Sequence, residues 1–130
     1  MMSIIELKPA NFESVTSGRD VVVVECWASW CGGCEAFEPT FVEVGRRHPD
    51  VTFAKLDTGA HPELTDAVGV SHVPTLLVFR DGLPLLRHPG AVDEAGLESI
   101  VAQAAALDMS VVRAEMEREA REAGHALGVG

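Results

Sequence analysis

The sequence predicts an α/β domain organised around buried β-strands. Two short apolar runs, residues 21–26 and 75–79, lack the alternation of a half-exposed strand and are typical of strands covered on both faces. Between them, a helix-forming stretch leads to a third strand pattern at residues 51–56, which gives a strand–helix–strand unit with parallel strands. A chain of 130 residues is long enough for one such domain with its own core.

The first half of the chain is punctuated by proline and glycine. From residue 3 to residue 47 we expect a strand, a short helix, the first buried strand and a long helix, at residues 3–7, 10–16, 21–26 and 32–47. Pro9 should stop the first strand, and Gly18 should end the short helix. Phe37, Phe41 and Val44 recur at helical spacing and should form the buried face of the long helix.

The second half alternates strands and helices in the same way. From residue 51 to residue 107 we expect a strand, a helix, two strands and a helix, at residues 51–56, 62–68, 75–79, 83–87 and 93–107. Pro62 suits the first position of a helix, and Asp93 suits a helix N-cap. The Asp81-Gly82 pair predicts a hairpin turn, and Pro84 places the strand after it at a sheet edge.

The last segment has its own amphipathic pattern. Its apolar stripe contains Met109, Val112, Met116, Ala123 and Leu127. Acidic and basic residues alternate over the other faces, as in a solvated helix. We therefore divide the chain into a domain at residues 1–107 and a C-terminal amphipathic helical extension at residues 108–130. Either the stripe packs back on the domain or frays, or it supports self-association.

The charge balance excludes several classes of partner. The chain carries 20 acidic and 10 basic residues, a formal net charge of −10. Nucleic acids and anionic membrane surfaces both require a basic surface. The first ten residues do not resemble a secretory signal, and no apolar run approaches the length of a membrane span. We therefore expect a cytoplasmic protein with no nucleic-acid or membrane partner.

Cys31 and Cys34 stand at the junction between the first buried strand and the long helix. Backbone N–H groups in the first turn of a helix have no intrahelical partners, and the helix dipole there favours negative charge. A thiolate at this place is therefore stabilised, and the thiolate is the nucleophile in sulfur exchange. Because residues three apart share a helix face, the two sulfurs can close into a disulfide and open again. The pattern points to dithiol–disulfide chemistry.

Several further motifs occur in a fixed order between about residue 21 and residue 107. They are Trp27-Ala28-Ser29-Trp30-Cys31-Gly32-Gly33-Cys34, Pro39, Lys55 within AKLD, Val73-Pro74-Thr75, Asp81-Gly82 and Gly90-Ala91. In these motifs and their order the chain resembles the thioredoxin family. The resemblance implies a three-layer α/β/α fold, with a central mixed β-sheet flanked by helices, to which the C-terminal helix is added.

The resemblance also implies an activity, the exchange of disulfides with protein substrates. Cys31 would attack the substrate disulfide, and Cys34 would resolve the mixed disulfide that forms. The redox couple is then the cysteine pair itself, so no organic cofactor is required, and electrons come from a separate disulfide reductase. We expect a reductase of protein disulfides, because the setting is expected to be cytoplasmic.

The resemblance assigns substrate contacts to residues around the cysteine pair. These residues are Trp30, Gly32, Gly33, Val73, Pro74, Gly90 and Ala91. The family's proline at the position of Pro74 follows a cis peptide bond and lies against the cysteines, where the neighbouring backbone pairs with substrate. Trp30 is expected to cover the site, and Trp27 to pack beneath it. His72 stands where the family usually has glycine; it is either close enough to favour the Cys31 thiolate or an exposed loop residue without a role.

Glu25 and Lys55 complete the expected catalytic set. Glu25 closes an apolar strand, so burial should raise the pKa of its carboxyl. One interpretation makes it the proton acceptor for Cys34, and the other makes it a structural ion pair with Lys55; the two are compatible. Glu25 stands where the family has an aspartate, so its longer side chain can displace the carboxylate. Cys26 is expected to be a core residue.

Two alternative functions stay open at this point. Cys31 and Cys34 could supply half of the ligands of a zinc or iron–sulfur site, but no second pair completes four ligands within the chain, so no metal is expected unless two chains share it. In a redox-inactive binding module, the dithiol would hold a partner or such a shared metal. Gly33 stands where thioredoxins usually carry proline, and because residues between the cysteines tune the redox potential, a disulfide isomerase or oxidant is the other alternative.

Overall fold

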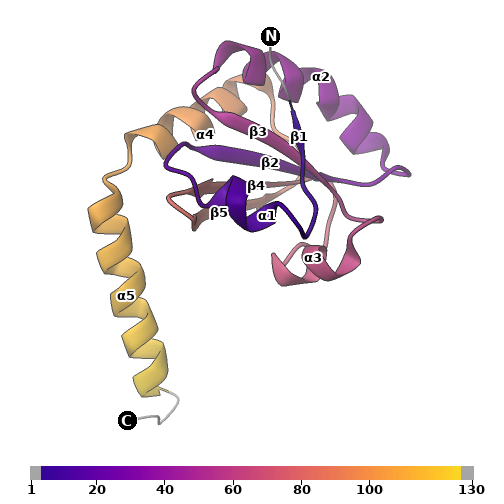
Figure 1. Cartoon of the computed structure of the whole chain (residues 1–130). Helices are drawn as coiled ribbons and strands as arrows, with labels where there is room; N and C mark the ends of the chain where they lie inside the picture. Colours follow the sequence, from indigo (N-terminus) through magenta and orange to yellow (C-terminus); the bar gives the residue numbers. More distant parts are fainter. Residues whose placement is uncertain (1–3, 127–130) are drawn as a thin grey trace.

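The computed structural model describes residues 4–126 of the chain. The elements in order are β1 (Ile5–Glu6), α1 (Phe12–Thr16), β2 (Val22–Trp27), α2 (Gly32–Arg47), β3 (Thr52–Asp57), α3 (Pro62–Ala67), β4 (Thr75–Arg80), β5 (Leu83–Pro89), α4 (Glu94–Ala106) and α5 (Met109–Ala126) (Figure 1). Every element expected from the sequence is present, with ends that differ by a few residues at most.

The sheet is mixed, with the strand order β1-β3-β2-β4-β5. β1, β3 and β2 run parallel, which confirms the strand–helix–strand unit predicted from the sequence. β4 and β5 form an antiparallel pair, and β4 lies antiparallel to β2. β5 is an edge strand, as Pro84 indicates, since proline cannot donate to a ladder. The sheet therefore places β2 in its centre, between β3 and β4.

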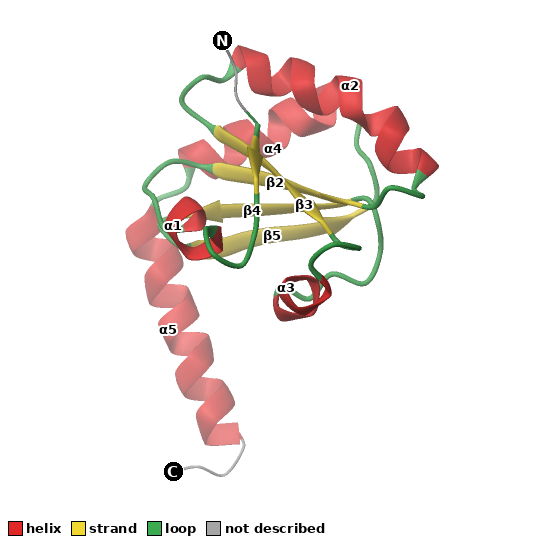
Figure 2. Cartoon of the chain, turned by 45° about the vertical axis from the view of Figure 1, so that its right-hand side comes forward, coloured by secondary structure: helices red, strands yellow, loops and turns green. Residues whose placement is uncertain are grey.

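Two layers of helices cover the sheet, α2 and α4 on one face and α1 and α3 on the other (Figure 2). Successive side chains of a strand point to opposite faces, so Val23 of β2 belongs to the core under α2 and α4, whereas Val22 and Val24 belong to the core under α1 and α3. This alternation confirms that β2 is buried on both faces and confirms the α/β/α architecture. It also directs Glu25 toward the face that α2 covers.

The first elements are shorter than predicted. Of the strand expected at residues 3–7, only Ile5 and Glu6 are paired as a strand, and residue 3 lies outside the described residues. α1 begins at Phe12 instead of residue 10, because Asn11 fixes a turn before it. The Asn11 side chain accepts a hydrogen bond from the Lys8 N–H (2.7 Å) and donates one to the Glu6 carbonyl (3.0 Å).

α5 leaves the domain at a corner instead of packing along it (Figures 1 and 2). Its first residue, Met109, is buried, and the Arg113 guanidinium pairs with Asp81 in the β4–β5 turn (3.0 Å). Arg80 donates a hydrogen bond to the Leu107 carbonyl (2.9 Å) at the corner. Beyond this base the expected stripe is half-buried at most, and its last member, Leu127, lies outside the described residues.

Within the described residues, no single helix is both long and apolar enough to cross a membrane. Only α4 and α5 taken together reach that length and apolarity, and an 87° bend separates them.

Candidate active site

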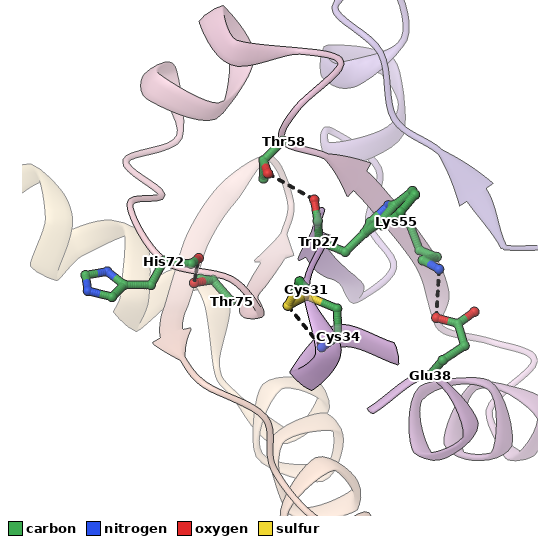
Figure 3. The surroundings of a disulfide bond; sticks show 8 residues. All are labelled: Trp27, Cys31, Cys34, Glu38, Lys55, Thr58, His72 and Thr75. Carbon is green, nitrogen blue, oxygen red and sulfur yellow. Dashed lines mark hydrogen bonds and ion pairs between the residues drawn. A yellow bond between two sulfur atoms is a disulfide. The ribbon is translucent and has the colours of Figure 1, made fainter. Parts of the chain in front are cut away.

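The cysteine pair sits where the sequence places it, at the start of α2. β2 ends at Trp27, and Cys31 is the N-cap residue of α2. The N–H of Cys34 donates a hydrogen bond to the Cys31 sulfur (3.1 Å). The two residues form a disulfide, with their Cα atoms 5.3 Å apart (Figure 3). Cys31 is half-exposed and Cys34 is buried, so an incoming substrate meets Cys31 first.

A cavity of about 340 Å³ lies behind the disulfide. Its walls are formed by Glu25, Trp27, Ala28, Ser29, Cys31, Cys34, Glu35, Glu38 and Lys55. Three of these residues come from the sheet. Glu25 and Trp27 are two residues apart on β2 and therefore point to the same face, and Lys55 lies opposite Glu25 in the register of β3. The sheet alternation and the first two turns of α2 thus bring a carboxylate, a lysine and both cysteines to one cavity.

Glu25 is fully buried, and no N–H or O–H donor among the described residues contacts either oxygen of its ionised carboxylate. Burial raises the pKa of this carboxyl from 4.5 to about 7; the positive charge of Lys55 opposes the rise, and both the negative charge of Glu38 and a side-chain hydrogen bond between Glu25 and Glu38 add to it. A carboxyl with this pKa can accept or release a proton near neutral pH, which is the property that general acid–base catalysis requires.

Lys55 does not form the expected ion pair with Glu25. Its Nζ donates a hydrogen bond to Oε2 of Glu38 (2.7 Å) and lies 4.9 Å from the centre of the Trp27 ring. Figure 3 shows the lysine side chain directed at Glu38. Glu38 lies one helical turn after Cys34, at the mouth of the cavity, where its carboxylate competes successfully for the ammonium group. The structural ion-pair interpretation of Glu25 is therefore wrong.

Pro74 and Gly90 lie together beside the turn that joins the two cysteines. The Val73–Pro74 peptide bond is cis, as the resemblance implies. The Gly90 N–H donates to the Pro74 carbonyl (2.8 Å), which holds the loop after β5 against this proline. A Cβ atom added at Gly33 would lie 3.5 Å from the Pro74 ring, so the turn between the cysteines packs against it.

Trp30 stands out from the surface beside the disulfide. Its side chain is 78% exposed. It shares a groove of about 350 Å³ with Thr58, Pro62, Thr65, Asp66, Val70, Ser71, His72 and Val73. Of the expected substrate-contact residues, Gly32, Gly33 and Ala91 are also exposed, and a side chain added at Gly32 would meet open space. The arrangement leaves room for an extended segment between Trp30 and the loop before Pro74.

The positions of His72 and Cys26 do not support a role for either residue at the Cys31–Cys34 pair. Figure 3 shows the imidazole of His72 pointing away from the disulfide, and its Nδ1 contacts the Ser71 hydroxyl (3.0 Å). This geometry favours the exposed loop residue over a role at Cys31. Cys26 is fully buried in β2, as expected, and burial raises the pKa of its thiol to about 12, which keeps it protonated. Among residues 4–126, no cluster of side chains suited to a metal ion is found.

Glu38 is the residue of this site that the sequence analysis missed. A signal was present, because Glu38 follows Cys34 by four residues and must share its helix face. Its partner on β3 could not be read from that spacing.

The comparisons with known proteins agree with this geometry. A family model described as Thioredoxin matches residues 3–103. A Streptomyces coelicolor protein assigned as thioredoxin 2 is 38% identical over 124 residues, which are 95% of this chain and 92% of that protein, so the match extends into the C-terminal segment. A bifunctional thioredoxin reductase/thioredoxin of Mycobacterium leprae is 36% identical over 95 residues, which are 72% of this chain and 21% of that protein.

The fold of this chain also matches that of a solved thioredoxin structure. The crystal structure of a Malassezia sympodialis thioredoxin superimposes with a TM-score of 0.71 at 30% identity, covering 78% of this chain and 90% of that one.

Proposed function

Because this chain belongs to the thioredoxin family and is a protein disulfide oxidoreductase, we propose that it works as a reductase, transferring two electrons from the Cys31–Cys34 dithiol to disulfides of protein substrates. The observation that carries the proposal is the pairing of a half-exposed sulfur at a helix N-terminus with a buried sulfur that lines the same cavity as a carboxylate without a hydrogen-bond donor among the described residues. This arrangement gives the two cysteines different tasks.

Cys31 is the attacking sulfur. Its thiolate displaces one sulfur of the substrate disulfide, so that a mixed disulfide forms and the first substrate thiolate leaves. The Cys34 N–H, which contacts the Cys31 sulfur at 3.1 Å, is the donor that stabilises negative charge there. The first step therefore needs no group from outside the start of α2.

Cys34 resolves the mixed disulfide. Its thiol gives its proton to Glu25, and the thiolate attacks the Cys31 sulfur; the second substrate thiolate leaves, and the Cys31–Cys34 disulfide of this structure is the product. Two electrons pass from the dithiol to the substrate in the cycle. Lys55 belongs to the same proton-handling group, since it lines the cavity with Glu25.

The substrate segment docks across the cis proline. We assign its contacts to Trp30, Gly32, Gly33, Val73, Pro74, Gly90 and Ala91. Exposed Trp30 and the groove beside it supply apolar surface, and the loop held by the Gly90–Pro74 hydrogen bond supplies backbone groups for pairing.

The electron donor is a separate disulfide reductase. The Mycobacterium leprae relative, whose name joins a thioredoxin reductase to a thioredoxin, supports this choice. We assign the chain to the cytoplasm, where it would carry electrons in thiol redox homeostasis. No organic cofactor enters the cycle, because both electrons reside on the cysteine pair.

Trapping the mixed disulfide tests this function. A Cys34→Ser variant should accumulate a covalent complex with a protein disulfide substrate, because Cys31 attacks and nothing resolves. A Cys31→Ser variant should form none. Mass spectrometry of the two reaction mixtures distinguishes them. If Cys34→Ser forms no adduct, the chain is a binding module and not a reductase.

Residues 1–107 form the catalytic domain in this proposal, and residues 108–130 form an extension with a second role in self-association. Val111 is 57% exposed on α5, and Val112 and Met116 are only half-buried. The helix carries both charge signs, so two antiparallel copies can place arginines beside glutamates. A dimeric mass that becomes monomeric in Met116→Glu supports the proposal, and a monomeric wild type at tens of micromolar rejects it.

A further inference from the structure

We propose that Glu38 is a positioning residue of the redox site: by holding Lys55 at the mouth of the cavity, it leaves Glu25 without an ion-pair partner and able to take up the proton of Cys34. The inference rests on the proposed function of Glu25 and adds a residue to it. Glu38 touches neither sulfur in this account, and it acts through Lys55.

The register of the sheet sets up the competition for Lys55. Glu25 and Lys55 lie opposite each other on the parallel strands β2 and β3, with their side chains on the face covered by α2. A glutamate and a lysine placed in this way would ordinarily form an ion pair. Instead, the Lys55 Nζ donates to Glu38 at 2.7 Å, and the Glu25 carboxylate receives no hydrogen bond from a donor among the described residues.

The positions of Glu38 and Lys55 explain this outcome. The side chain of Glu38 is 39% exposed and that of Lys55 is 22% exposed, so their pair lies at the solvent side of the cavity. Glu25 is fully buried beneath it. An ammonium group keeps more of its hydration at the mouth than at the buried carboxyl, and desolvation of a charged pair is costly. Glu38 therefore supplies the less costly partner for Lys55.

The ion pair between Lys55 and Glu38 affects the charge state of Glu25. The charged groups that line the cavity with Glu25 are Lys55, Glu38 and Glu35. Lys55 favours the Glu25 carboxylate, whereas Glu38 disfavours it through its own charge and through a side-chain hydrogen bond that needs a protonated Glu25. By holding Lys55, Glu38 also keeps the lysine from pairing with Glu25. With Glu38 in place, Glu25 titrates near neutral pH and is a stronger base than a carboxylate paired with lysine. Without Glu38, Lys55 can turn to Glu25 and stabilise its ionised form.

The titration of the Glu25 carboxyl, followed by ¹³C NMR in the oxidised protein, tests the inference directly. The disulfide removes the titration of both thiols from the measurement. In Glu38→Gln the midpoint of Glu25 should fall by about one pH unit or more, since a freed opposite charge lowers a carboxyl pKa by that amount. In Lys55→Met the midpoint should rise.

A double variant separates positioning from simple charge. If Glu38 acts by holding Lys55, then Glu38→Gln should move the Glu25 midpoint less than half as far in the Lys55→Met background as in the wild type. An equal shift in both backgrounds would overturn the positioning role, because it would mean that Glu38 acts on Glu25 directly, through its charge and its hydrogen bond. An unchanged midpoint in Glu38→Gln would overturn the inference altogether.

Glu35→Gln is the matched control. It removes one negative charge from the same helix and the same cavity wall, but Glu35 has no ion pair with Lys55 among the contacts of the described residues. In Glu35→Gln the titration midpoint of Glu25 should shift by no more than about a few tenths of a pH unit. If Glu38→Gln fails to fold, Glu38→Ala gives the same comparison, since the site is on the helix surface. A Glu35→Gln shift as large as that of Glu38→Gln would reject the inference.

The kinetic counterpart is the pH profile of the resolution step. In Glu38→Gln the profile should move to lower pH together with the Glu25 titration. If Glu25→Gln leaves the rate of resolution unchanged, the proposed role of Glu25 as proton acceptor fails. The NMR result on Glu38 is independent of that outcome, so the two failures can be told apart.

Discussion

The backbone N–H of Cys34 points at the sulfur of Cys31 from 3.1 Å away. Cys31 is the half-exposed N-cap of α2, whereas Cys34 is 4% exposed. In the reduced protein the same donor and the helix N-terminus should stabilise a Cys31 thiolate. We therefore expect limiting iodoacetamide at neutral pH to alkylate Cys31 at least about tenfold faster than Cys34, because only the exposed thiolate is both nucleophilic and accessible.

Peptide mass spectrometry of the partly alkylated, reduced protein measures this ratio. Cys26 provides an internal control, since it is fully buried with a thiol pKa of about 12 and should stay unmodified while the fold is intact. Equal alkylation of Cys31 and Cys34 would contradict the assignment of the attacking sulfur.

The buried carboxyl of Glu25 should make stability fall as pH rises. Its pKa is about 7 in the folded protein and near 4.5 in the unfolded chain, so between these values the folded state holds a proton that the unfolded state has released. Stability from this group is complete below the unfolded pKa and is lost as pH rises through about 7. Between acid and alkaline pH, this group should lower the free energy of unfolding of the wild type by roughly 2 to 3 kcal/mol. Glu25→Gln, whose side chain resembles the protonated acid, should not show this decrease.

Urea unfolding at pH 5 and pH 8.5 tests this sign. The oxidised wild type should lose stability between the two values, and oxidised Glu25→Gln should lose clearly less. The variant should therefore be the more stable protein at pH 8.5 and nearly equal at pH 5. A variant less stable than wild type at pH 8.5 would mean that Glu25 is ionised and well solvated.

Trp30 should contribute to the binding of protein substrates but little to stability or to the reaction with small disulfides. Its side chain is 78% exposed, so Trp30→Ala should change the free energy of unfolding by no more than about 0.5 kcal/mol. Loss of its apolar surface should raise KM for a protein disulfide severalfold while the rate with a small disulfide stays close to wild type. Val42→Ala, which truncates an exposed apolar side chain on α2, is the matched control and should change neither.

The local elements of this fold could be predicted because their signals are local. The helix predicted at residues 32–47 is α2 within its observed bounds, since the cysteine turn starts it and His48-Pro49 ends it. Asp93 caps α4 as expected, accepting a hydrogen bond from the Gly96 N–H at 2.7 Å. The strand bounds at residues 21–26 and 75–79 shift by only one residue at an end.

Contacts between distant segments could not be predicted in the same way. The sequence places Lys55 opposite a strand that contains Glu25, but the choice between Glu25 and Glu38 depends on solvent exposure at the mouth of the cavity. The base of α5 likewise carries a contact between distant residues, the Arg113–Asp81 pair, which joins residues 32 positions apart. The helix itself was predictable from its amphipathic pattern, but the corner at its base was not.

The reduction potential of the Cys31–Cys34 pair decides whether the two cysteines form a reducing couple. Equilibration of the protein against mixtures of reduced and oxidised glutathione, read by mass after acid quenching and alkylation, gives that potential. We predict a potential more negative than that of the cytosolic glutathione pool, which lies at about −220 to −260 mV by extraction. A potential well above that range would indicate an oxidant or isomerase, and a pair that never exchanges in a folded protein would leave only a binding module.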